Sequence, residues 1–170
     1  MGEIADLLGS STAFSGMPRN EAMRIVDVML MQTYRKGDVL AEEGAPSAGK
    51  LILIVSGEVQ ISSRGATDGG HLVFRKARPG HLIGEVGFID NQPHSATCMA
   101  LTDMHVAVMQ RDHLVHLLEH NALAAAQLMA GLLRLLAQRI RVANTHMLSQ
   151  DRKILALQKE QLARHRESVQ

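Results

Sequence analysis

Glycine and proline occupy only one part of this 170-residue chain, and that division constrains the fold more than any other feature. Thirteen of the 14 glycines and all 4 prolines lie at or before Pro93, and only Gly131 follows. These two residue types mark turns and are the poorest formers of helix interiors. We therefore expect a turn-rich domain of short strands, followed by a long helix that nothing interrupts.

The turn-rich part contains short segments with the hydrophobic patterns of β-strands. Residues 51–55 form a wholly apolar run, typical of a buried strand, and residues 58–61 alternate polar and apolar side chains as a half-buried strand does. The other predicted strands are residues 33–34, 39–40, 71–78, 82–83, 95–100 and 104–109, with a flexible hairpin loop at 62–70. Short strands at regular spacing predict a β-sandwich or a β-roll.

Helical patterns mark both ends of the chain. Residues 20–29 place apolar side chains at helical spacing and predict a short N-terminal helix. Residues 112–120 predict another helix. Asn121 is a suitable N-cap for a third helix, which we expect to run from residue 122 to the C-terminus because no proline intervenes.

The last helix carries a heptad pattern, with seam positions spaced alternately four and three residues apart as in a coiled coil. The seam is Ala122, Ala126, Met129, Leu133, Leu136, Ile140, Ala143, Met147, Gln150, Ile154 and Leu157. A helix of about 45 residues reaches roughly 68 Å, which is too long to pack on so small a domain. We therefore expect two chains to pair along the seam, with a helix folded back on its own domain as the alternative. The predicted organisation is a β-roll with its N-terminal helix at residues 1–120 and a dimerisation helix at residues 121–170.

Charge and composition argue against several classes of protein. The formal net charge of +1 predicts neither bulk nucleic-acid binding nor attraction to a membrane surface. Residues 133–170 hold 8 basic and 3 acidic side chains, which we interpret as the solvated face of the coiled coil. The single cysteine, Cys98, rules out an internal disulfide framework, and no apolar run approaches the ~20 residues that span a bilayer. The acidic N-terminus lacks the basic start of a signal peptide, so we expect a cytoplasmic protein without a membrane segment.

The most informative segment is residues 80–97. Its pattern predicts a strand end, a corner at Gly84 and Glu85, one short helical turn, and a polar turn into another strand. Glycine permits close backbone approach, and the N–H groups at a helix start favour an anion. Glu85 offers an acceptor for sugar hydroxyls, and Ser95 and Ala96 offer backbone donors. These features together predict a cradle for a phosphate with an attached sugar.

This segment resembles the phosphate-binding cassette of the cyclic-nucleotide-binding domain family, as in bacterial catabolite-activator-like regulators and kinase regulatory subunits. The matching residues are Gly84-Glu85-Val86-Gly87-Phe88 and Ser95-Ala96-Thr97. Upstream, residues 14–18 look like the family's first helix, residues 34–44 like its first hairpin, and residues 53–59 like its central turn. The resemblance runs from about Leu7 to about Asn144 and therefore covers most of the chain.

The resemblance implies both a fold and a function. The fold is α+β: an antiparallel β-roll of the double-stranded β-helix (jelly roll) kind, with a short N-terminal helix, a short cassette helix and a long C-terminal dimerisation helix. The function is a non-catalytic signalling module that binds cAMP or cGMP and relays occupancy through the dimeric helix to a protein partner. The implied ligand-binding residues are Gly84, Glu85, Val86, His94, Ser95 and Ala96, with Asn144 or Thr145 on the long helix touching the base.

The sequence departs from the family pattern at two positions. The family's phosphate-binding arginine corresponds to His94, and a histidine is only about a quarter protonated at pH 7 whereas arginine is always charged. A charge-assisted hydrogen bond contributes ~1.5–3 kcal/mol, which is roughly one to two decades in affinity. In the regulators that this chain resembles, small hydroxyl residues of the long helix contact the purine. The matching stretch here contains Ala143, whose side chain cannot donate a hydrogen bond to a base. Two functions stay open: a cyclic-nucleotide sensor, and a structural adaptor that binds another ligand or none and dimerises through the coiled coil.

Other kinds of chemistry find less support. His113, His116 and His120 share one helix face, but no acidic or cysteine ligand accompanies them, so we expect no metal site and no cofactor. A haem sensor that uses a histidine or Cys98 is a minor alternative, because Cys98 is expected to be a buried apolar residue. No nucleophile–base pair or phosphate-binding glycine loop indicates an enzyme. Residues 148–170 lack the second helix of a helix-turn-helix, so we expect no DNA-binding module.

Overall fold

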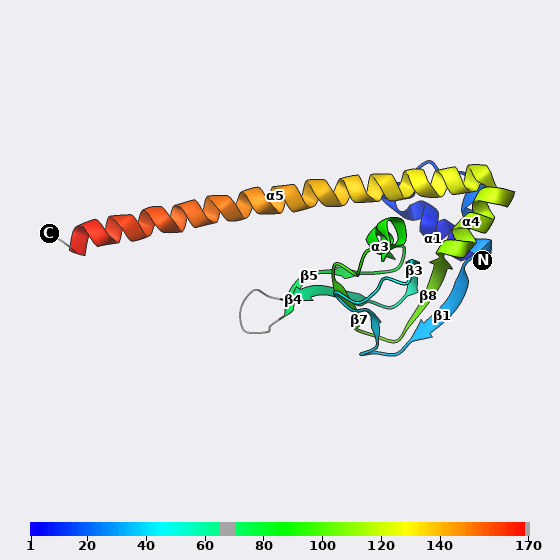
Figure 1. The fold of residues 1–170 in the computed structure, drawn as a ribbon, viewed down its shortest axis with the longest axis horizontal. Helices are drawn as coiled ribbons and strands as arrows, with labels where there is room; N and C mark the ends of the chain where they lie inside the picture. The colour runs from blue at the N-terminus through cyan, green and yellow to red at the C-terminus, as the bar shows by residue number, and fades with distance from the viewer. Residues whose placement is uncertain (65–70, 169–170) are drawn as a thin grey trace. The chain divides into compact units, whose positions relative to one another are not determined.

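The computed structural model describes residues 1–64 and 71–168, and its elements alternate with short turns (Figure 1). The helices are α1 (Gly2–Ser10), the 3₁₀ turn η1 (Thr12–Phe14), α2 (Arg19–Asp27), α3 (Glu85–Asp90), α4 (Arg111–His120) and α5 (Ala122–Ser168). The strands are β1 (Leu30–Tyr34), β2 (Val39–Ala41), β3 (Lys50–Ser56), β4 (Val59–Arg64), β5 (His71–Ala77), β6 (Leu82–Ile83), β7 (Thr97–Ala100) and β8 (Met104–Gln110). Most of the predicted hairpin loop at 62–70 lies outside the described residues.

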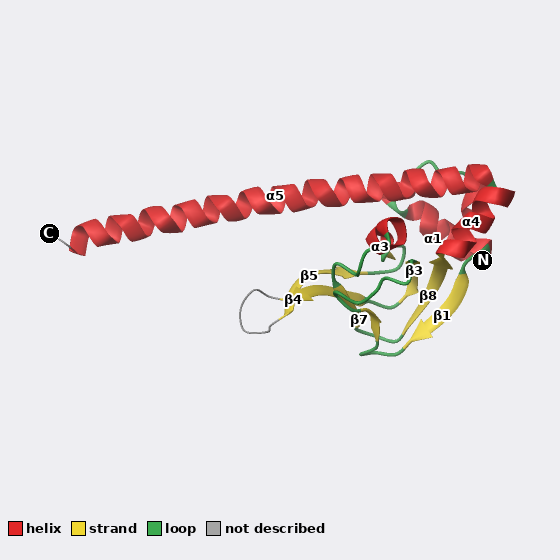
Figure 2. Ribbon diagram, in the orientation of Figure 1, coloured by secondary structure: helices red, strands yellow, loops and turns green. Residues whose placement is uncertain are grey.

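The described strands form two antiparallel sheets (Figure 2). One sheet has the strand order β1-β8-β3-β6 and the other has the order β2-β7-β4-β5. Neighbours such as β3 and β8 are far apart in sequence, so the chain crosses between the sheets several times, as in a roll. This topology confirms the predicted α+β fold built on an antiparallel β-roll.

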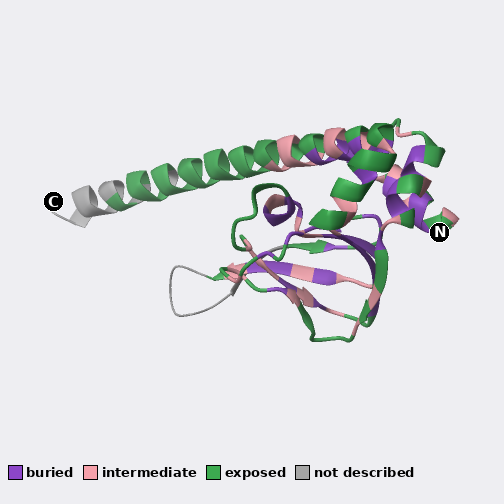
Figure 3. Ribbon diagram, turned by 45° about the vertical axis from the view of Figure 1, so that its right-hand side comes forward, coloured by how far each residue is buried: buried purple, intermediate pink, exposed green. Residues whose placement is uncertain are grey.

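The core of the roll takes side chains from both sheets. Alternate residues of a strand point to the same side, and here they are Ile52 and Ile54 on β3 and Val59 and Ile61 on β4, all at most 7% exposed. The other members of the core are Ala41, Ala77, Ile83, Cys98, Ala100, Met104, Val106 and Val108. Figure 3 shows the resulting buried stretches along the strands.

Strand β3 is apolar on both faces because both faces are covered. Leu51 and Leu53, which alternate with the core residues of β3, are 1% and 0% exposed. Helices α1 and α3 pack on this strand. The wholly apolar run at residues 51–55 therefore reflects a strand that lies between the core and a helical layer.

The helices bury a second set of apolar side chains, which are Leu8, Phe14, Ile25, Leu117, Leu128 and Leu132. Gly131 lies against Phe14 so closely that a Cβ at position 131 would be 2.1 Å from the Phe14 ring.

The sequence predicts one short N-terminal helix, whereas the structure has α1 in addition to α2. Residues 14–18 are not the helix that the resemblance implied, because Gly16 has a φ of +86° and Pro18 precedes the start of α2.

The chain divides into two compact units, residues 1–132 and residues 133–170. Helix α5 begins in the first unit and makes up the described part of the second. The predicted domain boundary at residues 120 and 121 coincides with the junction of α4 and α5 and stays a prediction.

The predicted heptad seam of α5 is not the face that packs in the first unit. The buried residues there are Ala124, Ala125, Leu128, Gly131 and Leu132. Farther along, the seam residues Leu133, Ile140, Met147, Ile154 and Leu157 are 51–64% exposed.

By length and composition alone, residues 122–159 would also pass for a membrane-crossing helix, as some core helices of soluble proteins do. The expectation that no segment is long and apolar enough to cross a membrane is therefore wrong.

Candidate functional site

The corner at Gly84 is the foundation of the candidate site. Gly84 follows β6 with a φ of +79°, and a Cβ there would lie 2.5 Å from the carbonyl oxygen of Lys50. Only glycine fits such a position without strain. The carbonyl of Gly84 accepts a hydrogen bond from the backbone N–H of Phe88 at 3.0 Å, which closes the first turn of α3. The predicted short cassette helix is therefore present where the sequence placed it.

Glu85 and Val86 begin α3 next to this corner. Glu85 is only 1% exposed, and Val86 is half-buried. In the same turn of α3, a Cβ at Gly87 would lie 2.5 Å from the Cβ of Ser47. The hydroxyl of the buried Ser47 donates to the carbonyl of Gly87 at 3.2 Å. The loop between β2 and β3, residues 42–49, thus packs directly on α3.

The same loop holds the second segment of the cassette. The backbone N–H of His94 donates to the carbonyl of Ala45 at 2.9 Å, and the N–H of Gly44 donates to the carbonyl of His94 at 2.8 Å. Ser95 is exposed, and the half-buried Ala96 packs against the core. Residues 42–49 therefore join the two segments, 84–88 and 94–96, that the sequence assigned to one site.

A carboxylate fixes this connecting loop to the neighbouring strand. Glu43 accepts hydrogen bonds from the Ser63 hydroxyl at 2.7 Å and from the Arg64 backbone N–H at 2.8 Å. Its own N–H donates to the Thr97 hydroxyl at 3.1 Å. Glu43 and Ser47 are not evident from the sequence, because their roles depend on contacts between segments that are far apart in the chain.

The electrostatic surroundings of His94 disfavour its charged form. Partial burial lowers the pKa of the imidazole, and the nearby Lys50 ammonium lowers it further. A histidine with a lowered pKa is largely neutral at pH 7. The position that carries a permanent cation in the family pattern therefore carries a mostly uncharged ring in this chain.

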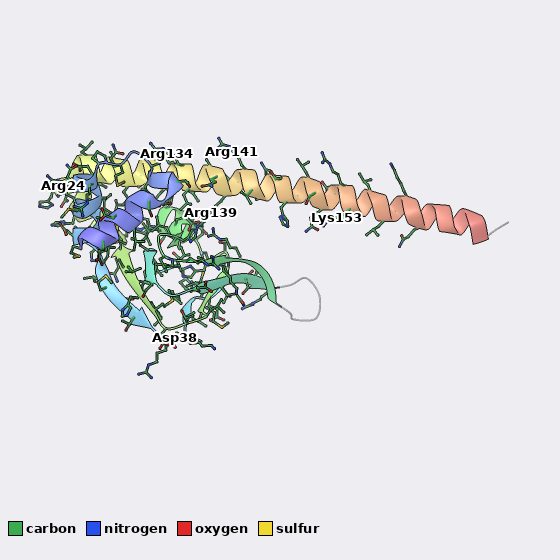
Figure 4. The ribbon with its side chains drawn as sticks, turned by 180° about the vertical axis from the view of Figure 1, so that it is seen from behind. Arg24, Asp38, Arg134, Arg139, Arg141 and Lys153 are labelled. Atoms are coloured by element: carbon green, nitrogen blue, oxygen red, sulfur yellow. The ribbon has the colours of Figure 1, made fainter. Side chains whose placement is uncertain are left out.

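The far end of α3 is connected to α4. The Arg111 guanidinium donates to the carbonyl of Phe88 at 2.8 Å. Arg111 is the first residue of α4, and Asn121 at the other end of α4 accepts a hydrogen bond from Arg24 of α2. Figure 4 shows Arg24 beside the start of α5. Arg111 thus links the end of α3 to the start of α4, and Asn121 links the end of α4 to α2.

Asn144 and Thr145 lie on the exposed part of α5 in the second unit. The Thr145 hydroxyl donates to the carbonyl of Arg141, four residues earlier in the same helix, at 2.9 Å. Their contact with a base stays a prediction.

The histidines of α4 lie as the sequence indicated. The rings of His116 and His120 stack with their centroids 4.1 Å apart, and His113 caps the start of α4. Across residues 1–64 and 71–168, no group of three or more metal-ligating side chains is found.

Comparison with known proteins decides which family this cassette represents. The family model of the cyclic nucleotide-binding domain matches residues 31–121, more than half of the chain. The chain belongs to the cyclic nucleotide-binding domain family. The matched range contains both cassette segments and the loop that joins them.

The relatives of this chain include kinases and transcriptional regulators. The chain is 29% identical to the cGMP-dependent protein kinase egl-4 of Caenorhabditis briggsae over 108 residues, which cover 64% of this chain and 14% of the kinase. It is 25% identical to the CRP-like cAMP-activated global transcriptional regulator of Mycobacterium tuberculosis over 142 residues, 84% of this chain and 61% of the regulator. The chain therefore spans only part of the length of these relatives.

A solved cyclic nucleotide-binding domain from Methylobacillus flagellatus KT has the same fold. Its TM-score with this chain is 0.77 at 28% identity, and the match covers 87% of this chain and 82% of that one. The likeness therefore extends beyond the matched range of residues 31–121 to much of the chain.

Proposed function

We propose that this chain is a sensor that binds a cyclic nucleotide, cAMP or cGMP, at the cassette formed by residues 84–88 and 94–96. The observation that carries the proposal is the joining of these two segments by residues 42–49, in a member of the cyclic nucleotide-binding family. The mycobacterial relative is described as cAMP-activated and the nematode relative as cGMP-dependent, so both nucleotides are candidates.

Different groups of the cassette serve different parts of the ligand. In the proposal, the Glu85 carboxylate accepts a hydrogen bond from a ribose hydroxyl, since an ionised carboxylate offers acceptors only. The backbone N–H groups of Ser95 and Ala96 donate to the phosphate. The neutral His94 ring adds one donor, and the glycine at position 84 permits the left-handed corner at which α3 begins.

Occupancy reaches α5 through α4. A ligand that favours one position of α3 shifts the population of that position, and Arg111 transmits the shift because it holds both the Phe88 carbonyl and the start of α4. The exposed heptad seam of α5 then pairs with the seam of a second copy, and the helix pair is the surface that a protein partner recognises.

The test is calorimetric titration of the purified chain with cAMP and with cGMP. We expect saturable binding of at least one nucleotide at one site per chain. Glu85→Gln, which removes the charged acceptor, should weaken that binding by roughly tenfold. Glu119→Gln, at an exposed position of α4, is the matched control and should leave the affinity unchanged.

Absence of heat with both nucleotides at millimolar concentration would overturn the sensor proposal. If such an unresponsive chain sediments as a dimer, the adaptor function takes its place.

A further inference from the structure

A charged residue stands in a row of otherwise small or apolar residues on the inner face of the sheet β2-β7-β4-β5. Ala41 of β2 is opposite Cys98 of β7, Cys98 is opposite Ile61 of β4, and Ile61 is opposite Arg75 of β5. Side chains at paired positions of an antiparallel sheet project from the same face. The first three residues belong to the core of the roll, so Arg75 projects from the core-facing side of β5.

The Arg75 guanidinium lies near the Cys98 thiol. Its positive charge acts to lower the pKa of that thiol, although burial dominates and raises the pKa of Cys98 to about 11. A thiol with that pKa is neutral at pH 7, so it does not compensate the charge of Arg75. Burial also lowers the pKa of Arg75 itself, but a guanidinium stays protonated at any pH at which proteins are folded.

Arg75 combines inner-face placement with solvent access. Residue 75 as a whole is exposed, whereas its three row neighbours are 6–8% exposed. No salt bridge of Arg75 is found among the residues that the structure describes. A permanent cation on the inner face of a ligand-binding roll, with neutral side chains at the paired positions, is suited to bind a negatively charged group of the ligand.

The row of Arg75 is adjacent to the second cassette segment. Ala96, whose side chain packs on the same core, is two residues from Cys98, or about 7 Å along the strand. The backbones of β7 and β5 are separated by β4 and thus by about 10 Å. The Arg75 charge acts on Cys98, so the guanidinium lies within electrostatic reach of β7.

We propose that Arg75 donates hydrogen bonds to the phosphate of the bound cyclic nucleotide and supplies the permanent positive charge that His94 lacks. This inference rests on the proposed cyclic-nucleotide function and adds a residue from β5 to a site that the sequence placed only on the cassette and α5. A guanidinium can grip two phosphate oxygens at once, so one arginine from β5 replaces the family's cassette arginine.

The test compares Arg75→Gln with Lys76→Gln in calorimetric titrations with cAMP and cGMP. Lys76 is the exposed neighbour on the opposite face of β5 and is the matched control. We expect Arg75→Gln to weaken binding of both nucleotides by roughly ten- to a hundredfold, and Lys76→Gln to leave it unchanged. Introducing His94→Arg into the Arg75→Gln variant should restore much of the lost affinity, because the cation then returns to the cassette.

Three results separate the possibilities. Unchanged affinity in a folded Arg75→Gln variant, judged by an unchanged melting temperature, would exclude Arg75 as a ligand contact. A loss of affinity for only one of the two nucleotides would indicate that Arg75 contacts the base, which is the part in which they differ. That result would overturn the assignment of Arg75 to the phosphate. Failure of the unaltered chain to bind either nucleotide would instead refute the proposed function on which the inference rests.

Discussion

At the scale of single residues, the chemistry of His94 differs from that of the arginine it replaces. A free imidazole titrates in the physiological range, and partial burial together with Lys50 lowers the pKa of His94 from the ordinary value of 6.5. The charge of His94 therefore depends on pH, whereas the charge of the Arg75 guanidinium does not. In the proposed site, a fixed cation on β5 is distinct from a titratable ring on the cassette.

The lowered pKa predicts a pH dependence of stability. The unfolded chain binds a proton at His94 near pH 6.5, whereas the folded chain binds it only at lower pH. The unfolded state therefore holds more protons in this window, and stability falls as pH drops below about 6.5 and is fully present above it. Denaturant midpoints at pH 7.5 and pH 5.5 check this. The decrease should be smaller in His94→Gln, and an equal decrease in both proteins would contradict the assignment.

At the scale of elements, close packing between helices depends on single small residues. A Cβ at Gly131 would be 2.1 Å from the Phe14 ring, so α5 and η1 can approach only because this position has no side chain. Glycine in a helix interior costs about 1 kcal/mol relative to alanine. The close approach explains why the sole glycine after Pro93 lies in the middle of an otherwise strong helix.

Gly131→Ala should therefore destabilise the fold by about 1–3 kcal/mol, although alanine is the better helix former. Equilibrium unfolding in urea measures the difference in the free energy of unfolding. The control is Gln138→Ala, at an exposed position of the same helix outside the heptad seam, which should change the free energy of unfolding by less than about 0.5 kcal/mol. A stabilised Gly131→Ala variant would show that Phe14 does not pack against this position.

Local patterns predicted most of the elements, and long-range contacts account for what they missed. The apolar run at 51–55 and the alternation at 58–61 are strands β3 and β4, and the motif at 84–90 is α3. Helix α1 was missed. Its apolar residues Ile4 and Leu8 are spaced for a helix, but the nine-residue segment has glycines near both ends.

The same distinction holds for the candidate site. The Gly-Glu corner and residues 94–96 are contiguous motifs and could be predicted from sequence. The loop residues Ala45 and Ser47 join those motifs through contacts about 40 or more residues away in sequence, which no local pattern reports. Arg75 did leave a signal, since it lies two residues before the core residue Ala77 and alternate residues of a strand share a face.

At the scale of the whole molecule, the two units carry different kinds of surface. Residues 1–132 bury a core and build the cassette, whereas residues 133–168 are a helix with an exposed apolar seam and an excess of basic side chains, Arg134, Arg141 and Lys153 among them (Figure 4). A seam of this kind is stable in water when a second helix covers it. In the proposed function, residues 1–132 bind the ligand and the exposed seam of α5 pairs with a second copy.

The most direct measurement of the central claim is a crystal structure of the full chain grown with saturating cAMP or cGMP. We predict the cyclic phosphate within hydrogen-bond distance of the Ser95 and Ala96 backbone N–H groups, and a ribose hydroxyl on the Glu85 carboxylate. A nucleotide bound elsewhere on the chain, or a cassette that stays empty in a crystal saturated with both ligands in turn, would contradict the account.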